Sequence, residues 1–178
     1  MAGAYVRNIR TYVHTYARTY VGADWGGGGI GGETGGEREG GGERPRRPQD
    51  PRDMDKVGWT PLMHAAQASA YCWRAARAVR SLALAVNSDG QRLSDVNAFT
   101  RNSLWPRKTC LHIACESTFG RGIDEQLYVV NSLLDAGANT EVETSEGHTP
   151  LFCAERGGFT EVCKLLLSRG ARSRHFTA

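Results

Sequence analysis

The 178-residue chain lacks the features of membrane-spanning and secreted proteins. No apolar run approaches the ~20 residues that a bilayer span requires. The start has no secretory apolar segment, and no N-x-[ST] glycosylation acceptor occurs. The five cysteines are odd in number and form no C-x-x-C pair, which favours buried free thiols in a reducing compartment. We therefore expect no membrane partner and a cytoplasmic location, with the nucleus left open.

An excess of charge of one sign is also missing. The net charge is +3, and from Met54 onward 14 basic residues stand against 12 acidic ones. Nucleic-acid-binding domains usually carry a basic patch or stripe, and this sequence shows none. We therefore expect no nucleic-acid partner.

Motifs for catalysis are absent as well. The sequence contains no G-x-S-x-G, H-E-x-x-H or HRD-like segment. The best metal candidate is Cys110-x-His112-x-x-Cys115, because histidine and cysteine both ligate zinc, but a fourth ligand is missing. We interpret Cys115 as a core residue and predict that the protein is not an enzyme and binds no cofactor.

The first 53 residues have a repetitive composition instead of a folding pattern. A four-residue tandem contains Tyr12, Tyr16 and Tyr20, and 11 of the 22 glycines fall between residues 26 and 42. The glycine-rich part has too few apolar side chains to offset the entropy of ordering it. We predict a disordered low-complexity tail over residues 1–53.

Two other interpretations of this tail stay open. The acid-free, arginine-bearing start is compatible with an organelle transit peptide, although threonine and tyrosine are poor helix formers and serine is absent there. Residues 44–48 have the proline spacing of a polyproline II ligand for an SH3-like groove, a spacing that arises often by chance in such tails.

From residue 54 onward, a helix-start signal occurs three times. Thr60, Thr109 and Thr149 open the segments T-P-L-M-H-A-A, T-C-L-H-I-A-C and T-P-L-F-C-A-E. Threonine suits the N-cap position, and proline suits the first helical position, where no amide donor is needed. The leucine and the alanine three residues later share one face, and the small alanine allows a neighbouring helix to approach closely.

A second helix is predicted after each first one. The segments V-V-N-S-L-L-D-A-G and E-V-C-K-L-L-L-S-R-G end at Gly137 and Gly170, where a left-handed C-cap is expected. One such helix pair cannot hide its apolar stripe alone, so successive pairs must stack. We expect Leu62, Leu111 and Leu151 at equivalent buried positions in successive layers.

The order of these signals resembles the ankyrin repeat: G-x-T-P-L-x-x-A-A at the start, V-x-x-L-L in the second helix, and G-A-N or D-V-N-A at the exit. The resemblance covers about residues 55–171. It implies an all-α fold, a solenoid of about three helix-turn-helix units with β-hairpin fingers. We assign residues 1–53 to the tail and 54–178 to the repeat domain, with units at about 55–98, 99–141 and 142–174.

Three departures from the family pattern are visible. The repeat threonines are 49 and 40 residues apart, against a family period of about 33, which predicts longer loops. His112 occupies the position of the family's hydrogen-bonding histidine. The first unit has Met63 at that position, and its His64 is expected to face elsewhere.

The resemblance implies that partners lie against the finger tips and the inner helices. Carried over by position, the candidate partner-binding residues are Lys56, Val57, Trp59, Gln67, Phe99, Arg101, Trp105, Arg107, Lys108, Glu116, Ser145, Glu146, His148 and Arg156. Aromatic and arginine side chains dominate binding energy at interfaces, so we expect Trp59, Arg101 and Trp105 to be anchors. The alternative for Trp105 is that it folds back over the long finger.

Two burial predictions complete the expected surface. We expect Trp73, on the second helix of the first unit, to be a core residue. No polar capping helix follows Gly170, so we expect the face around Leu165 and Leu166 to be partly uncovered. That would mean marginal stability, a partner on that face, or a fragment of a longer array.

The functional hypothesis is a non-enzymatic module that binds a partner protein or an extended peptide, acting as a monomer. The alternative is a regulatory or targeting adaptor fragment of a larger assembly, which has less support because no effector segment is visible.

Overall fold

The computed structural model describes residues 54–55, 58–70, 73–86, 88–101, 107–116 and 122–173. The predictions made for the tail at 1–53 lie outside these residues. None of the described helices combines the length and the apolar character needed to cross a membrane.

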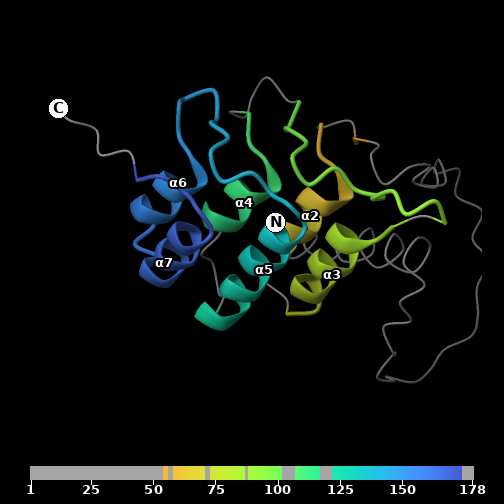
Figure 1. Ribbon diagram of the computed structural model, residues 1–178, viewed down its shortest axis with the longest axis horizontal. Helices are drawn as coiled ribbons and strands as arrows, with labels where there is room; N and C mark the ends of the chain where they lie inside the picture. The colour runs from red at the N-terminus through yellow and green to blue at the C-terminus, as the bar shows by residue number, and fades with distance from the viewer. Residues whose placement is uncertain are drawn as a thin grey trace, which may run out of the picture.

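Three helix pairs make up the described part of the chain (Figure 1). The first helices are α2 (Pro61–Ala68), α4 (Cys110–Glu116) and α6 (Pro150–Arg156). The second helices are α3 (Trp73–Leu84), α5 (Ile123–Asp135) and α7 (Thr160–Ser168). The first helices pack on one another in the order α2, α4, α6, and the second helices pack in the order α3, α5, α7. The result is a two-layer stack, as the three sequence signals predict.

The first helices begin where the threonines predict. The hydroxyl of Thr60 accepts a hydrogen bond from the backbone N–H of Met63 at 3.3 Å, and proline occupies the next position. The hydroxyl of Thr149 accepts from the N–H of Phe152 at 3.2 Å, again before a proline. Each bond satisfies an N–H that the helix itself leaves without an acceptor.

The second helix α5 ends at the predicted glycine. Gly137 has a φ of 83°, and the N–H groups of Gly137 and Ala138 donate to the carbonyls of Leu134 and Leu133 at 2.9 and 3.0 Å. This is the Schellman arrangement, which favours glycine because the left-handed conformation is strained for other residues. The turn sends the chain back toward the first helix of the next unit.

The core is continuous through all three pairs. Leu62, Leu111 and Leu151 are buried at the same position of α2, α4 and α6, with at most 2% of each residue exposed. The prediction of equivalent sites in successive layers is confirmed. Each helix pair therefore buries its apolar stripe against the neighbouring pairs.

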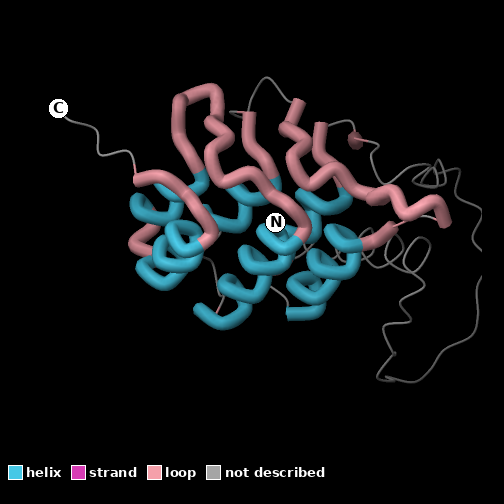
Figure 2. Tube along the Cα trace, in the orientation of Figure 1, coloured by secondary structure: helices cyan, strands magenta, loops and turns pink. Residues whose placement is uncertain are grey.

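The loops between units gather along one side of the stack, next to the row of α2, α4 and α6 (Figure 2). Between α5 and α6, the N–H of Thr144 donates to the carbonyl of His148 at 2.9 Å, which closes a tight turn. Between α3 and α4, the N–H of Thr100 donates to the carbonyl of Lys108 at 2.9 Å. Each finger thus has a backbone hydrogen bond at its base, and the described part of the chain contains no strand.

Asn97 links the first unit to the second at their exits. Its side-chain amide donates to the carbonyl of Gly137 at 3.2 Å, and its side-chain oxygen accepts from the N–H of Asn139 at 2.9 Å. The recurring asparagine of the exit motif therefore aligns successive units.

One burial prediction is wrong, and the other holds only in part. Trp73 is 54% exposed, because the alanines of α3 occupy the buried face and Trp73 starts the opposite one. On α7, Leu165 is half-buried as predicted, but Leu166 is completely buried, since it lies one turn after the buried Val162. The next leucine, Leu167, is 46% exposed.

Candidate functional site

The predicted binding residues fall on two fingers and the row of first helices. We call the described residues 99–101 and 107–108 finger one, and residues 141–148 finger two. Lys56, Val57 and Trp105 lie outside the described residues.

Trp59 is a buried residue of the first unit. It is only 7% exposed, and its ring centroid lies 5.3 Å from that of His64. Asp55 holds both residues: its carboxylate accepts from the N–H of Trp59 at 2.9 Å and lies 2.7 Å from Nε2 of His64. His64 thus faces away from the helix cap, as predicted, and little of Trp59 is available to a partner.

Finger one presents a stacked arginine. The guanidinium carbon of Arg107 lies 4.1 Å from the centroid of the half-buried Phe99 ring, within range of a cation–π contact. Arg101 is also exposed, and its backbone N–H donates to the carbonyl of Gly58 at 3.1 Å. The structure therefore brings two of the predicted residues, Phe99 and Arg107, into contact, and Arg101 lies two residues beyond Phe99 on the same finger.

Lys108 of finger one forms an ion pair with Glu116, the last residue of α4. The second oxygen of Glu116 accepts a hydrogen bond from the thiol of Cys153 on α6 at 3.3 Å. Burial raises the pKa of Cys153 to about 12, so this thiol stays protonated and serves as a donor. The contact fixes Glu116 between two first helices, and no sequence signal indicates this role of Cys153.

His112 joins α4 to finger two. Its Nδ1 accepts from the backbone N–H of Thr109 at 3.1 Å, and its Nε2–H donates to the carbonyl of His148 at 3.1 Å. Burial lowers the pKa of His112, only partly offset by the hydrogen bond to His148, so the neutral ring is favoured. The predicted role of His112 as a hydrogen-bonding histidine is confirmed.

The first unit uses sulfur at the corresponding place. Sδ of Met63 accepts from the backbone N–H of Thr60 at 3.4 Å. Methionine can thus complete the helix cap, but it has no second nitrogen to reach a finger.

Finger two presents polar side chains around a turn. Ser145 and Glu146 are exposed, and Glu146 lies 3.2 Å from Nδ1 of His148. The His148 ring stacks on Phe152 of α6, with 4.4 Å between centroids. Phe152 was not among the predicted residues, although its place directly after the T-P-L signal puts it beside the finger.

The two remaining candidates lie on the first helices. Gln67 is half-buried near the end of α2, and Arg156 is exposed in the last turn of α6. The assignment of these two side chains to the binding surface rests on their position in the repeat.

The fingers differ in charge. Finger one carries Arg101, Arg107 and Lys108 without an acidic residue, whereas finger two carries Glu141, Glu143 and Glu146 without a lysine or arginine. A positively charged turn therefore precedes a negatively charged one along the stack.

The metal candidate of the sequence lies in the core. Cys110 and Cys115 are fully buried, and both ring nitrogens of His112 are engaged in hydrogen bonds. Burial raises the pKa of Cys110 to about 12, which disfavours the thiolate that binds zinc. In the described ranges, no three His, Cys, Asp or Glu side chains are grouped to hold a metal ion.

A stack of helix pairs with ordered fingers on one side is a repeat scaffold. A family model described as ankyrin repeats (3 copies) matches residues 77–177, more than half of the chain, and the chain therefore belongs to the ankyrin-repeat family. The match begins within α3, so α2 lies before it. No curated protein matches the chain. Ankyrin repeats are generally protein–protein interaction modules and are typically non-enzymatic.

Proposed function

We propose that the protein is a non-enzymatic module that binds a partner protein, or an extended peptide, through the fingers and the row of first helices. The observation that carries this proposal is that polar side chains are held in place there: His112 joins finger two to α4, and Lys108 of finger one pairs with Glu116 of α4. Side chains already fixed lose little conformational entropy on binding, which favours affinity.

The proposed surface contains every candidate except the buried Trp59. Lys56, Val57 and Trp105 belong to it by position, and Arg107 on Phe99 supplies an arginine–aromatic anchor. We propose the module at residues 54–178, with units at about 55–98, 99–141 and 142–174, acting as a monomer in the cytoplasm.

The opposite charges of the fingers constrain the partner. A partner segment that crosses both fingers should place acidic side chains against Arg101 and Arg107 and basic ones against Glu143 and Glu146. Electrostatic complementarity of this kind fixes orientation and raises the association rate. We propose a partner segment whose charge changes sign along its length.

Charge reversal tests this proposal. Cross-linking of the tagged full-length protein in cells, followed by mass spectrometry, identifies partners of the wild type. We expect Arg101→Glu/Arg107→Glu to lose the specific partner and Glu143→Lys/Glu146→Lys to lose the same one. A charge reversal of a close pair should weaken binding about tenfold or more.

Lys164→Glu is the control, because Lys164 is an exposed residue of α7, away from the fingers. It should retain the partner. An unchanged partner list for both finger variants would overturn the proposed surface. Loss of the partner in Lys164→Glu alone would move the site to the second helices.

A further inference from the structure

The outer face of α3 carries an aromatic residue and a row of arginines. Trp73, Arg77 and Arg80 are separated by four and three residues, so they lie on one stripe of the helix. All three are exposed, and the guanidinium carbon of Arg77 lies 5.7 Å from the centroid of the Trp73 ring. We call these three residues the α3 stripe.

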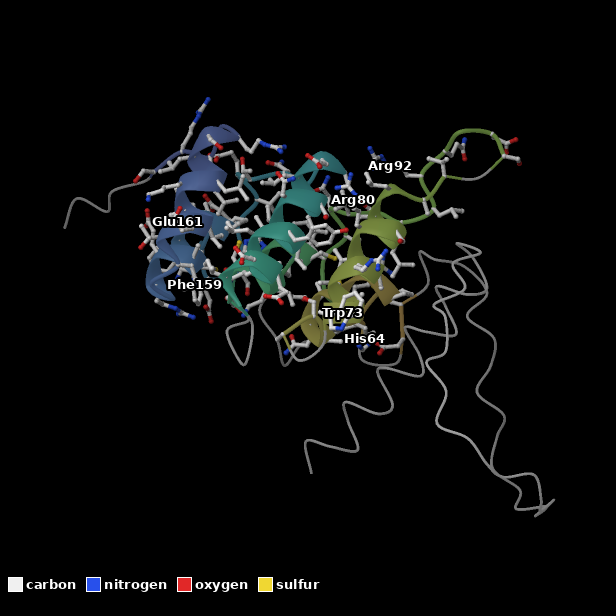
Figure 3. The ribbon with its side chains drawn as sticks, turned by 90° about the horizontal axis from the view of Figure 1, so that it is seen from below. His64, Trp73, Arg80, Arg92, Phe159 and Glu161 are labelled. Atoms are coloured by element: carbon white, nitrogen blue, oxygen red, sulfur yellow. The ribbon has the colours of Figure 1, made fainter. Side chains whose placement is uncertain are left out.

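The packing of α3 directs this stripe away from the stack. The helix contacts α2 and α5, and its buried side chains are mainly small: Ala75, Ala76, Ala78, Val79, Leu82 and Ala83. Alanines let α3 sit close to its neighbours, and Trp73, Arg77 and Arg80 lie on the opposite, exposed side. The stripe lies on the second-helix layer, apart from the fingers (Figures 1 and 3).

Positive charge dominates around the stripe. Helix α3 contains no acidic residue. Asp135 of α5 lies 3.4 Å from Arg80, but its carboxylate is shared with Arg169, which approaches to 3.0 Å. One carboxylate therefore stands between two guanidinium groups, and the local balance stays positive.

Arg92 extends this charge at the end of α3. Its guanidinium donates to the carbonyl of Ala83 at 3.0 Å, which holds it beside the last turn of the helix. Figure 3 shows Arg80 and Arg92 toward one end of α3 and Trp73 at the other. The face is thus aromatic at its start and basic along its length.

We propose that the α3 stripe is a second docking surface, which binds an acidic segment of a partner protein that also carries apolar side chains. Arginine forks match carboxylates in geometry as well as charge, so glutamate and aspartate suit Arg77 and Arg80. Tryptophan and arginine are the residue types most enriched among binding hot spots. Trp73 supplies the apolar contact that charge alone lacks.

The small size of the charged row favours a protein segment over a polyanion. Nucleic acids and anionic bilayers are bound by extended basic patches that neutralise many charges. Here the α3 stripe contains two arginines beside an indole, with Asp135 close by. This arrangement fits a short sequence in which acidic and apolar residues alternate.

Fluorescence anisotropy with the full-length protein tests the proposal. The probe is a short labelled peptide in which glutamate alternates with leucine, and its lysine–leucine counterpart is the charge control. We expect the acidic peptide to bind and the basic one not to bind. Trp73→Ala and Arg77→Glu should each weaken binding of the acidic peptide about tenfold or more, and added salt should weaken it further.

A control variant separates this surface from an effect of net charge. Lys164→Glu changes the net charge as much as Arg77→Glu does, and it should bind the acidic peptide like the wild type. Equal losses in Arg77→Glu and Lys164→Glu would overturn the proposal, because net charge would then explain binding. Binding that survives Arg77→Glu but is lost in Arg101→Glu/Arg107→Glu would place the peptide on finger one and overturn it too, as would no binding to the wild type. Binding to phosphatidylserine vesicles instead of the peptide, abolished by Arg77→Glu, would assign the stripe to a membrane surface and contradict it.

Discussion

The residue three places after the cap threonine decides whether the first helix is bonded to the next finger. Met63 and His112 stand at the same place in α2 and α4, and each accepts a hydrogen bond from the backbone N–H of its threonine. Only His112 has a second polar atom, which donates to the carbonyl of His148. The second unit is therefore attached to the finger that follows it through a side chain that can titrate.

The buried imidazole makes stability depend on pH. The folded state lowers the pKa of His112 below its usual value of 6.5, so the unfolded chain binds more protons as the solution becomes acidic. The contribution of His112 is complete above about pH 6.5 and is lost as the pH falls below that value toward the folded pKa.

We predict that His112→Met lowers the free energy of unfolding at neutral pH by about 1–2 kcal/mol, because the carbonyl of His148 loses its donor. The variant should also lose stability less steeply than the wild type between pH 7 and pH 5. Urea unfolding across this range, followed by circular dichroism, measures both effects. Parallel pH profiles for the two proteins would contradict the assignment of a neutral buried histidine.

At the scale of the element, the stability of a short helix depends on the hydrogen bonds at its ends. Helix α6 has seven residues, too few to be stable from its own propensity, so its cap and its packing must compensate. The hydroxyl of Thr149 provides that cap at 3.2 Å from the N–H of Phe152.

We predict that Thr149→Ala destabilises the protein by about 1 kcal/mol, as a lost N-cap usually does. Thr149→Ser keeps the hydroxyl and should cost much less. Chemical denaturation of the two variants side by side measures the difference. Equal losses would mean that the methyl group of Thr149, and not its hydroxyl, matters.

The sequence predicted the elements better than their orientation. Threonine, proline and glycine act locally, so the ends of α2, α5 and α6 followed from the residues themselves. The outward-facing side of α3 could not be predicted in this way. Its buried face consists mostly of alanine, and a hydrophobicity pattern favours placing Trp73 inside. In α7 three successive leucines leave the phase of the helix ambiguous, and only packing shows that Leu166 is the buried one.

The contacts between units could not be predicted from the sequence either. The bonds from Asn97 to Gly137 and Asn139, and from Cys153 to Glu116, join residues of successive units that are 40, 42 and 37 residues apart along the chain. Unequal loop lengths prevent such pairs from being read off a fixed period. Position in the repeat does not reveal burial: Trp59 is a candidate by position, but only 7% of it is exposed.

At the scale of the whole molecule, the stability of each repeat unit should depend on the units next to it. Helix α4 packs against α2, α5 and α6, so the middle unit supports both of the others. In such a linear array, the loss of one interface weakens the units on both sides. This sharing is the central physical claim made for the fold.

Leu111→Ala gives the most direct test, because Leu111 is fully buried at the centre of the middle unit. The substitution should cost about 2–5 kcal/mol. We predict that hydrogen–deuterium exchange, read by mass spectrometry on the full-length protein, becomes faster in α3 and in α7 as well as in α4. Wild-type protection of α3 and α7 in this variant would show that each helix pair is stable by itself, and would contradict the account.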